Sequence, residues 1–111
     1  MARFAVLKTN TEFRTLYYRG KSYVHPALIA YVRKNRRGET RVGITTSKKL
    51  GNAVTRNRCR RVIREAYRAL APEVKSGYDI VFVARTRTAA MKSTALSDVM
   101  RGQLRAAGLL P

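Results

Sequence analysis

The segment "YDIVFVAR", residues 78–85, constrains the fold most, because it is a nearly continuous apolar run. A strand with one wet face alternates apolar and polar residues, whereas a strand covered on both faces is apolar throughout. We therefore expect this segment to be a strand in the centre of a sheet. The chain has 111 residues, enough for one modest core, so residues 1–111 should form a single domain around that strand.

Three more segments read as strands. Residues 27–34 alternate apolar side chains between two faces, and the polar turn "NRRGET" separates them from a second strand at residues 41–46. This arrangement predicts an antiparallel hairpin over residues 27–46. Residues 22–24 should add a short edge strand.

Helices are expected before and after these strands. Thr9 and Glu12 have the spacing of a capping box, which predicts a short helix that ends at Gly20. Near the C-terminus, Ser93 and Thr94 are candidate caps of a last helix. The residues that repeat there with helical period and define one face of an amphipathic helix are Leu96, Val99, Met100, Gln103 and Leu104.

The middle helix is predicted from Ala53 to about Leu70, with Asn52 as N-cap and Pro72 beyond its end. At 100° per residue its apolar positions fall in one sector, and they are Cys59, Val62, Ile63, Ala66 and Leu70. The opposite side carries Arg56, Asn57, Arg60, Arg61, Arg64 and Arg68. The complete order is α-β-β-β-α-β-α, which indicates an α+β fold of the α–β sandwich type.

The charge of the chain points to its partner. Twenty-four Lys and Arg residues against six Asp and Glu give a formal net charge of +18. Such a surface repels itself unless a polyanion binds, so nucleic acid is the leading candidate and a membrane surface the rival. The chain has no apolar run of about 18 residues and no signal peptide, so we expect a cytoplasmic protein with no membrane partner.

Arginines on the middle helix sharpen this expectation. Arg56, Arg60, Arg64 and Arg68 follow one another at i,i+4, a spacing at which like charges repel by a few tenths of a kcal/mol per pair. An ordinary solvated helix face intersperses both signs. The planar guanidinium binds phosphate oxygens bidentately and stacks on bases, which suits ordered RNA contacts.

Aromatic residues make a second, weaker case for RNA. Phe13 and Tyr17 lie one helical turn apart, and Tyr31 sits in the middle of a predicted strand. Rings placed between a helix and a sheet could stack on bases, although packing in the core is the competing interpretation.

Catalytic groups of the protein itself are not apparent. Cys59 has no second thiol and His25 is alone, so neither suggests a metal site or a nucleophile. Hydrolysis of a phosphodiester by two metal ions needs clustered carboxylates. The six acids are scattered instead over Glu12, Glu39, Glu65, Glu73, Asp79 and Asp98.

The segment "KKLGNAVTRNRCRRVIREAYR" closely resembles the signature of the bacterial ribonuclease P protein subunit. The resemblance extends to "NTEFRTLYYRGKS" before it and "YDIVFVAR" after it, and covers roughly residues 7–85. It implies a small protein that binds a catalytic RNA and helps it remove the 5′ leader from precursor tRNA. The RNA would carry the chemistry and would hold, with the substrate, the Mg²⁺ ions; no organic cofactor and no obligate protein partner are implied.

The resemblance also implies the site residues. A cleft between the first helix and the sheet would take the leader, with Phe13, Tyr17 and Tyr31 as its aromatic positions. The strand–helix–strand crossover would be left-handed, against the usual right-handed rule. The RNA subunit would contact Lys48, Lys49, Arg56, Asn57, Arg58, Arg60, Arg61, Arg64 and Arg68.

Other classes of protein remain as alternatives on the sequence. A basic ribosomal protein, or another structural RNA-binding protein, would share the composition but would not need both an arginine helix and an aromatic cleft. A DNA-binding helix in a major groove lacks a helix-turn-helix partner before Asn52. A protein nuclease is disfavoured by the scattered acids.

Overall fold

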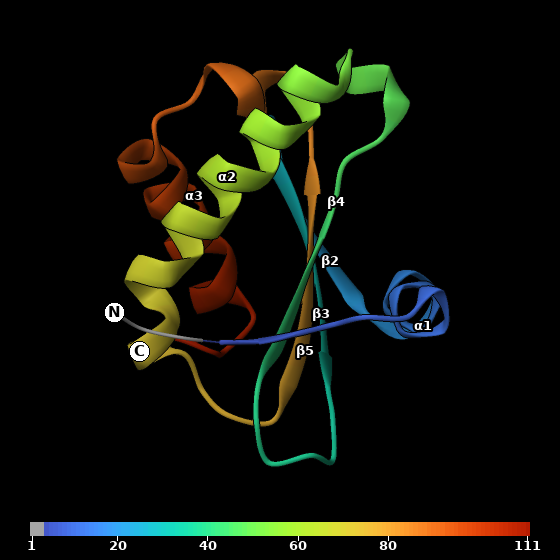
Figure 1. Cartoon of the computed structure of the whole chain (residues 1–111). Helices are drawn as coiled ribbons and strands as arrows, with labels where there is room; N and C mark the ends of the chain where they lie inside the picture. Colours follow the sequence, from blue (N-terminus) through green and yellow to red (C-terminus); the bar gives the residue numbers. More distant parts are fainter. Residues whose placement is uncertain (1–3) are drawn as a thin grey trace.

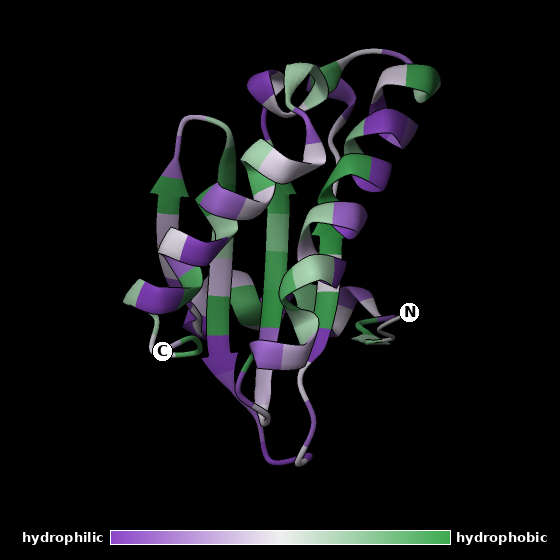
Figure 2. Cartoon of the chain, turned by 90° about the vertical axis from the view of Figure 1, so that its left-hand side faces the viewer, coloured by the Kyte–Doolittle hydropathy of each residue, from purple (hydrophilic) through white to green (hydrophobic). Residues whose placement is uncertain are grey.

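The centre of the computed structural model, which describes residues 4–111, is a five-stranded sheet in the order β1-β4-β5-β3-β2. β5 is the middle strand and pairs antiparallel with β3 and parallel with β4. The position expected for the apolar run is therefore confirmed, and Figure 2 shows that strand coloured apolar along most of its length. The strands are β1 (Ala5–Val6), β2 (Lys21–His25), β3 (Leu28–Lys34), β4 (Arg41–Thr45) and β5 (Tyr78–Ala84).

The predicted hairpin over residues 27–46 is wrong. β3 and β4 do not pair, because β5 lies between them and bonds to both. The hairpin is formed instead by β2 and β3, with His25 opposite Leu28. The polar turn signal at residues 35–40 shows that the chain reverses there, but it does not show that a later strand enters the gap.

Helices cover both faces of the sheet (Figure 1). α2 (Ala53–Leu70) and α3 (Ser93–Ala106) pack side by side on one face, and α1 (Asn10–Arg19) lies on the other. Short 3₁₀ turns occur at Lys48–Leu50, Ala71–Glu73 and Thr86–Ala90. The predicted element order is thus confirmed, with β1 as an additional strand that is too short to give a sequence pattern.

Local capping signals predicted the first two helices well. The Thr9 and Glu12 side chains form the expected capping box, and Asn52 accepts a hydrogen bond of 3.0 Å from the N–H of Thr55. The third helix differs, because Ser93 is already helical and Lys92 occupies the cap without a side-chain bond. The Ser93 and Thr94 caps were therefore wrong by one or two positions.

Two apolar clusters form the core. The larger one lies between the sheet and the α2–α3 layer, where Cys59, Ile63 and Leu70 are fully buried. Tyr67, which the helical wheel did not select, is also buried there, and burial raises its pKa to about 12. A smaller cluster of Leu7, Leu16 and Val81 lies under α1, with Phe13, Tyr31 and Val83 packed against it.

The crossover from β4 through α2 to β5 is left-handed. Seen from the helix layer with both strands running upward, β4 lies to the right of β5 and α2 passes in front of the sheet (Figure 2). This geometry leaves α2 close to the edge where β4 ends.

Candidate nucleic-acid interface

The arginines of α2 lie on the helix face turned away from the core. Asn57, Arg58, Arg61 and Arg64 are exposed, whereas Arg56, Arg60 and Arg68 are half-buried. The stripe is therefore accessible, but three of its cations lie against neighbouring elements. Lys48 and Lys49 are exposed in the 3₁₀ turn that leads into α2. They extend the basic surface beyond the helix start.

Most of this positive charge has no acidic partner. Among residues 4–111, Arg68 is the stripe residue that forms an ion pair, to Glu65 at 2.7 Å. Arg60 donates to Asn57 Oδ1 at 2.8 Å, and Arg58 donates to the carbonyl of Ala89 at 2.7 Å. The guanidinium charges are thus oriented but not neutralised, which leaves them available to an anion.

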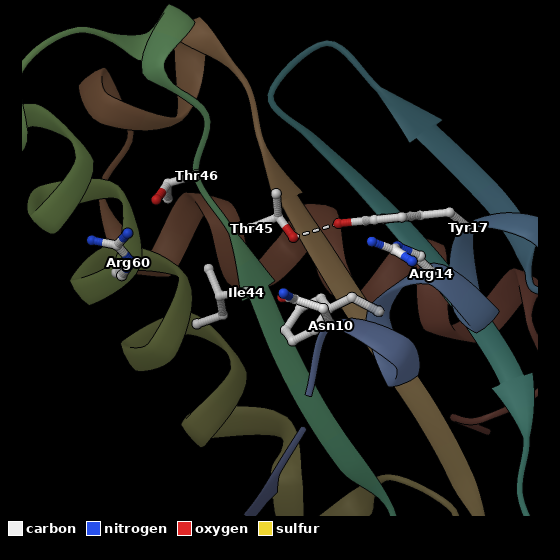
Figure 3. Close-up of a pocket in the computed structure, with 8 residues that line it drawn as sticks. Asn10, Arg14, Tyr17, Ile44, Thr45, Thr46 and Arg60 are labelled. Carbon is white, nitrogen blue, oxygen red and sulfur yellow. Dashed lines mark hydrogen bonds between the residues drawn. The ribbon is translucent and has the colours of Figure 1, made fainter. Parts of the chain in front are cut away.

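A cleft of about 380 Å³ lies beside this helix (Figure 3). It is enclosed by α1, by the end of β4 and by α2. Within residues 4–111, β1 pairs with β4 at Arg41 and Val42, and the Leu7 N–H then donates to the Val42 carbonyl. The described part of β1 therefore does not extend along the later part of β4. The residues that line the cleft are Asn10, Phe13, Arg14, Tyr17, Ile44, Thr45, Thr46 and Arg60.

Tyr17 is fixed at the cleft by two contacts. Its hydroxyl lies 2.5 Å from Thr45 Oγ1, as drawn in Figure 3. Its ring meets the ring of Tyr31 edge-on, with centroids 5.1 Å apart and planes at 76°. Tyr17 as a residue is nevertheless 38% exposed, so part of it stays open to a ligand.

The other two aromatic residues have different positions. Phe13 lines the cleft, is half-buried and packs over Gly43, where an added Cβ would lie 2.6 Å from the ring. It therefore belongs to both the cleft and the small cluster under α1. Tyr31 does not line the cleft but stands behind Tyr17. The structure thus brings the three predicted rings together, with Tyr17 the most accessible.

Several residues of the cleft are not among the site residues that the sequence predicts. Asn10 and Arg14 share a helix face with Phe13 and Tyr17, so helical spacing could have identified them. No sequence signal marks Thr46, whose buried Oγ1 has no hydrogen-bond partner among residues 4–111. Arg60, which the sequence predicts on the α2 surface, also forms a wall of the cleft.

An ion-pair network holds α1 against the sheet. Arg41 on β4 bridges Glu12 of α1 and Asp79 of β5, with Nη2 to Asp79 Oδ2 at 2.8 Å. The Glu12 carboxylate also accepts the backbone N–H groups of Lys8 and Thr9, each at 3.0 Å. These two bonds and then Arg41 lower the pKa of Glu12 from 4.5 to about 2.

Cys59 and His25, the other residues that could act in catalysis or bind a metal, have structural roles. Cys59 is buried, and burial raises the pKa of its thiol. His25 ends β2, and its Nδ1 accepts the N–H of Ala27 at 3.0 Å. Within residues 4–111, no three His, Cys, Asp or Glu side chains are grouped so that they could hold a metal ion. No helix in that range is long and apolar enough to cross a membrane.

Comparison with known proteins places this geometry in context. The family model described as Ribonuclease P matches residues 1–108. The ribonuclease P protein component of Clostridioides difficile strain 630 is 52% identical over 80 residues, which cover 71% of this chain and 70% of that one. The corresponding protein of Clostridium perfringens strain 13 is 41% identical over 110 residues, covering 93% and 88%.

Solved structures agree with the sequence matches. The RNase P protein of Staphylococcus aureus superposes with a TM-score of 0.82 at 29% identity, covering 98% of this chain and 100% of that chain. The RNase P protein of Thermotoga maritima gives a TM-score of 0.79 at 25% identity, covering 90% and 96%. The arrangement of sheet and helices described above is therefore shared with these proteins.

Proposed function

We propose that this chain, which belongs to the Ribonuclease P family, binds two RNAs through two adjoining surfaces. Members of the family are the protein component of a tRNA-processing endonuclease. The first surface is the arginine face of α2 with Lys48 and Lys49, and its partner is the catalytic RNA subunit. The second is the cleft beside α1, which takes the single-stranded 5′ leader of precursor tRNA.

One observation carries this proposal. Arg60 belongs to the α2 stripe and also lines the cleft that contains Phe13 and Tyr17. A phosphate of the leader can therefore meet a guanidinium within reach of two rings, and stacking plus charge is the usual combination for single-stranded RNA. The adjoining surfaces would place the leader beside the RNA subunit. A basic ribosomal protein, the alternative raised by composition, has no need for such a junction.

In the reaction the protein positions the RNAs and offsets the negative charge of their phosphates. We assign the bond cleavage to the RNA subunit, with Mg²⁺ held mainly by the two RNAs. Arginines beside the phosphates would lower the concentration of Mg²⁺ needed for folding and cleavage, because they replace part of the counterion atmosphere. Location in the cytoplasm stays a prediction from the sequence.

Equilibrium binding tests the proposal. The chain is assembled with a bacterial ribonuclease P RNA, and the affinities for precursor tRNA and mature tRNA are measured with and without the protein. We expect the protein to tighten binding of precursor tRNA while mature tRNA changes little, because only the precursor has a leader. Equal tightening of both RNAs would contradict the leader cleft, and failure to bind the RNA subunit would contradict the arginine surface.

A further inference from the structure

β2 is an edge strand of the sheet, and no strand within residues 4–111 covers its outer side. It stands last in the order β1-β4-β5-β3-β2 and pairs with β3. In an antiparallel pair, alternate residues turn their backbone N–H and C=O groups away from the neighbouring strand. The outer side of β2 is therefore a row of hydrogen-bonding groups with which a further strand could pair.

A groove of about 440 Å³ lies beside this edge strand. α3 forms its other wall, since α3 packs against β2 and β3, and Figure 2 shows α3 in front of this side of the sheet. The residues that line the groove are Ser22, Tyr23, Val24, His25, Val99, Gly102, Gln103 and Ala106. None of them is a Lys, Arg, Asp or Glu residue, so the groove has a neutral lining and an α3 wall of mostly small or apolar side chains.

Gly102 keeps the groove open in the interior of α3. Glycine weakens a helix interior relative to alanine. A Cβ at Gly102 would meet nothing within 4 Å, so no close packing in the described part of the chain requires a glycine there. Its missing side chain instead leaves room for the backbone of another segment to approach α3.

Gln103 brings an unused hydrogen-bond acceptor to the groove. Gln103 is buried, and its Nε2 donates to the carbonyls of Tyr23 and Leu28 at 2.8 and 2.9 Å. Both N–H groups of the amide are thus used, whereas Oε1 is buried with no hydrogen-bond partner among residues 4–111. Buried amide oxygens are normally bonded. An N–H group brought into the groove would supply the missing donor.

Cations stand at both ends of β2. Lys21 begins the strand and is exposed, with its Nζ 6.0 Å from the centroid of the Tyr23 ring. At the other end the exposed Arg85 donates to the carbonyl of His25 at 3.3 Å. Asp98, the acid of α3, lines a different hollow against α2. An acidic segment laid along β2 would therefore meet a cation at each end and no acid in the lining of the groove.

A second copy of this chain and an RNA strand suit this groove less well. Two copies repel, because each has a formal net charge of +18, and a lysine on an edge strand hinders self-pairing. Single-stranded RNA binds where cations follow its backbone and rings are open for stacking. The lining of the groove has no lysine or arginine, and its Tyr23 is half-buried.

We propose that the groove beside β2 binds an acidic, extended segment of a partner protein, which adds to the sheet as a further strand. Backbone hydrogen bonds to β2 and small apolar side chains against Val99 and Ala106 supply the affinity, as in other cases of strand addition. Carboxylates near Lys21 and Arg85 supply the selectivity. The groove and the cleft beside α1 share no lining residue, so the inference goes beyond the proposed function and both ligands can be bound together.

The test uses a short fluorescent peptide of alternating glutamate and valine as the probe. The control is the same peptide with N-methylated backbone amides, which keeps the charge and removes the backbone donors. Fluorescence anisotropy gives the affinity for the free protein and for the assembled holoenzyme, and hydrogen exchange locates the bound peptide. We expect slower exchange of the β2 amides with the unmethylated peptide, and roughly tenfold or more weaker binding of the methylated one. Equal binding of both peptides, or protection of α2 instead of β2, would overturn the proposal.

Gly102→Leu fills the groove without removing a contact. It should weaken binding of the peptide by roughly tenfold or more, because the leucine occupies the space of the peptide. Ala69→Leu is the control, since it adds the same bulk to the exposed hollow against α2. If Gly102→Leu melts like the parent and binds the peptide like the parent, the proposal is wrong. If it does not fold, the comparison of the two peptides decides.

Lys21→Glu tests the selectivity for acidic segments. It should weaken binding of the peptide by about two- to fivefold, whereas Lys92→Glu, which reverses an exposed charge outside the groove, should not. Equal effects of the two variants would contradict the role of Lys21.

The same measurements identify other occupants and separate this proposal from the RNA-binding function. Protection of the β2 amides by an RNA oligonucleotide would assign the groove to RNA. A dimer in sedimentation that Gly102→Leu dissociates would assign it to a second copy, and either result overturns the proposal. The Gly102→Leu holoenzyme should bind precursor tRNA like the parent, so failure of the peptide to bind leaves the proposed function intact.

Discussion

The ring of Tyr17 stands edge-on to the ring of Tyr31, with centroids 5.1 Å apart, while the Tyr17 hydroxyl is held 2.5 Å from Thr45 Oγ1. The first contact comes from β3 and the second from the end of β4. α1 therefore presents one ring at a fixed angle beside the open edge of the sheet. Such a ring can stack on a base without first losing its rotational freedom.

Tyr17→Ala should weaken binding of precursor tRNA to the assembled holoenzyme by roughly five- to a hundredfold, since stacking is worth about 1–3 kcal/mol per base. Mature tRNA should bind as before. Tyr18→Ala is the matched control, because Tyr18 is on the same helix, is 87% exposed and does not line the cleft. The affinity of Tyr17→Phe for precursor tRNA should lie between those of the parent and of Tyr17→Ala. An equal loss for both RNAs would rule out leader stacking at Tyr17.

Gly43→Ala should disturb the cleft from beneath. The new Cβ would lie 2.6 Å from the Phe13 ring, and overpacking of this kind costs about 1–3 kcal/mol. We expect a lower melting temperature together with weaker binding of precursor tRNA. Gly102→Ala on α3 is the control, because a Cβ there meets nothing within 4 Å. Unchanged stability of Gly43→Ala would contradict the packing of Phe13 against β4.

Arg60→Ala/Arg64→Ala should flatten the salt dependence of binding to the RNA subunit by about one unit of slope per lost contact. The free energy of unfolding should stay close to the parent value, because neither guanidinium pairs with an acid in residues 4–111. The measurement combines a salt titration with chemical denaturation. Parent-like slopes would show that α2 does not carry the phosphate contacts.

The free energy of unfolding should fall on acidification over the pH range in which Glu12 becomes protonated. The pKa of Glu12 is about 2 in the folded protein, below its ordinary value of 4.5. The ionised Glu12 carboxylate therefore stabilises the folded state fully above about pH 4.5, and this stabilisation is lost as the pH falls towards 2. In Glu12→Gln the melting temperature, followed by circular dichroism, should depend less on pH between pH 5 and 2 than it does in the parent. Parallel curves for parent and variant would contradict the role of the Arg41 network.

The sequence predicted features that depend on local chemistry. The bounds of α2 follow from the Asn52 cap, the amphipathic period and Pro72, and all are short-range signals. The central place of β5 follows from its apolar composition. Strand pairing could not be read in this way, because β3 and β4 are separated by a strand that comes more than 30 residues later in the chain.

The candidate site likewise has one part that the sequence predicts and one part that it does not. The arginine face of α2 was visible because one helix supplies all its members. The cleft depends on how α1, β4 and α2 meet, so the double position of Arg60 emerges only from tertiary structure. The same holds for Thr46 Oγ1, which is buried without a hydrogen-bond partner in the described part of the chain. The pairing of Arg41 with both Glu12 and Asp79 is likewise non-local.

Cleavage of precursor tRNA as a function of Mg²⁺ concentration shows whether the protein assists a catalytic RNA. Single-turnover rates are measured for the RNA subunit alone, for the RNA subunit with the protein, and for rigorously RNA-free protein. We expect the protein to shift the Mg²⁺ midpoint of RNA-catalysed cleavage to lower concentration and to cleave nothing alone. An unshifted midpoint, or cleavage by the protein without RNA, would contradict it.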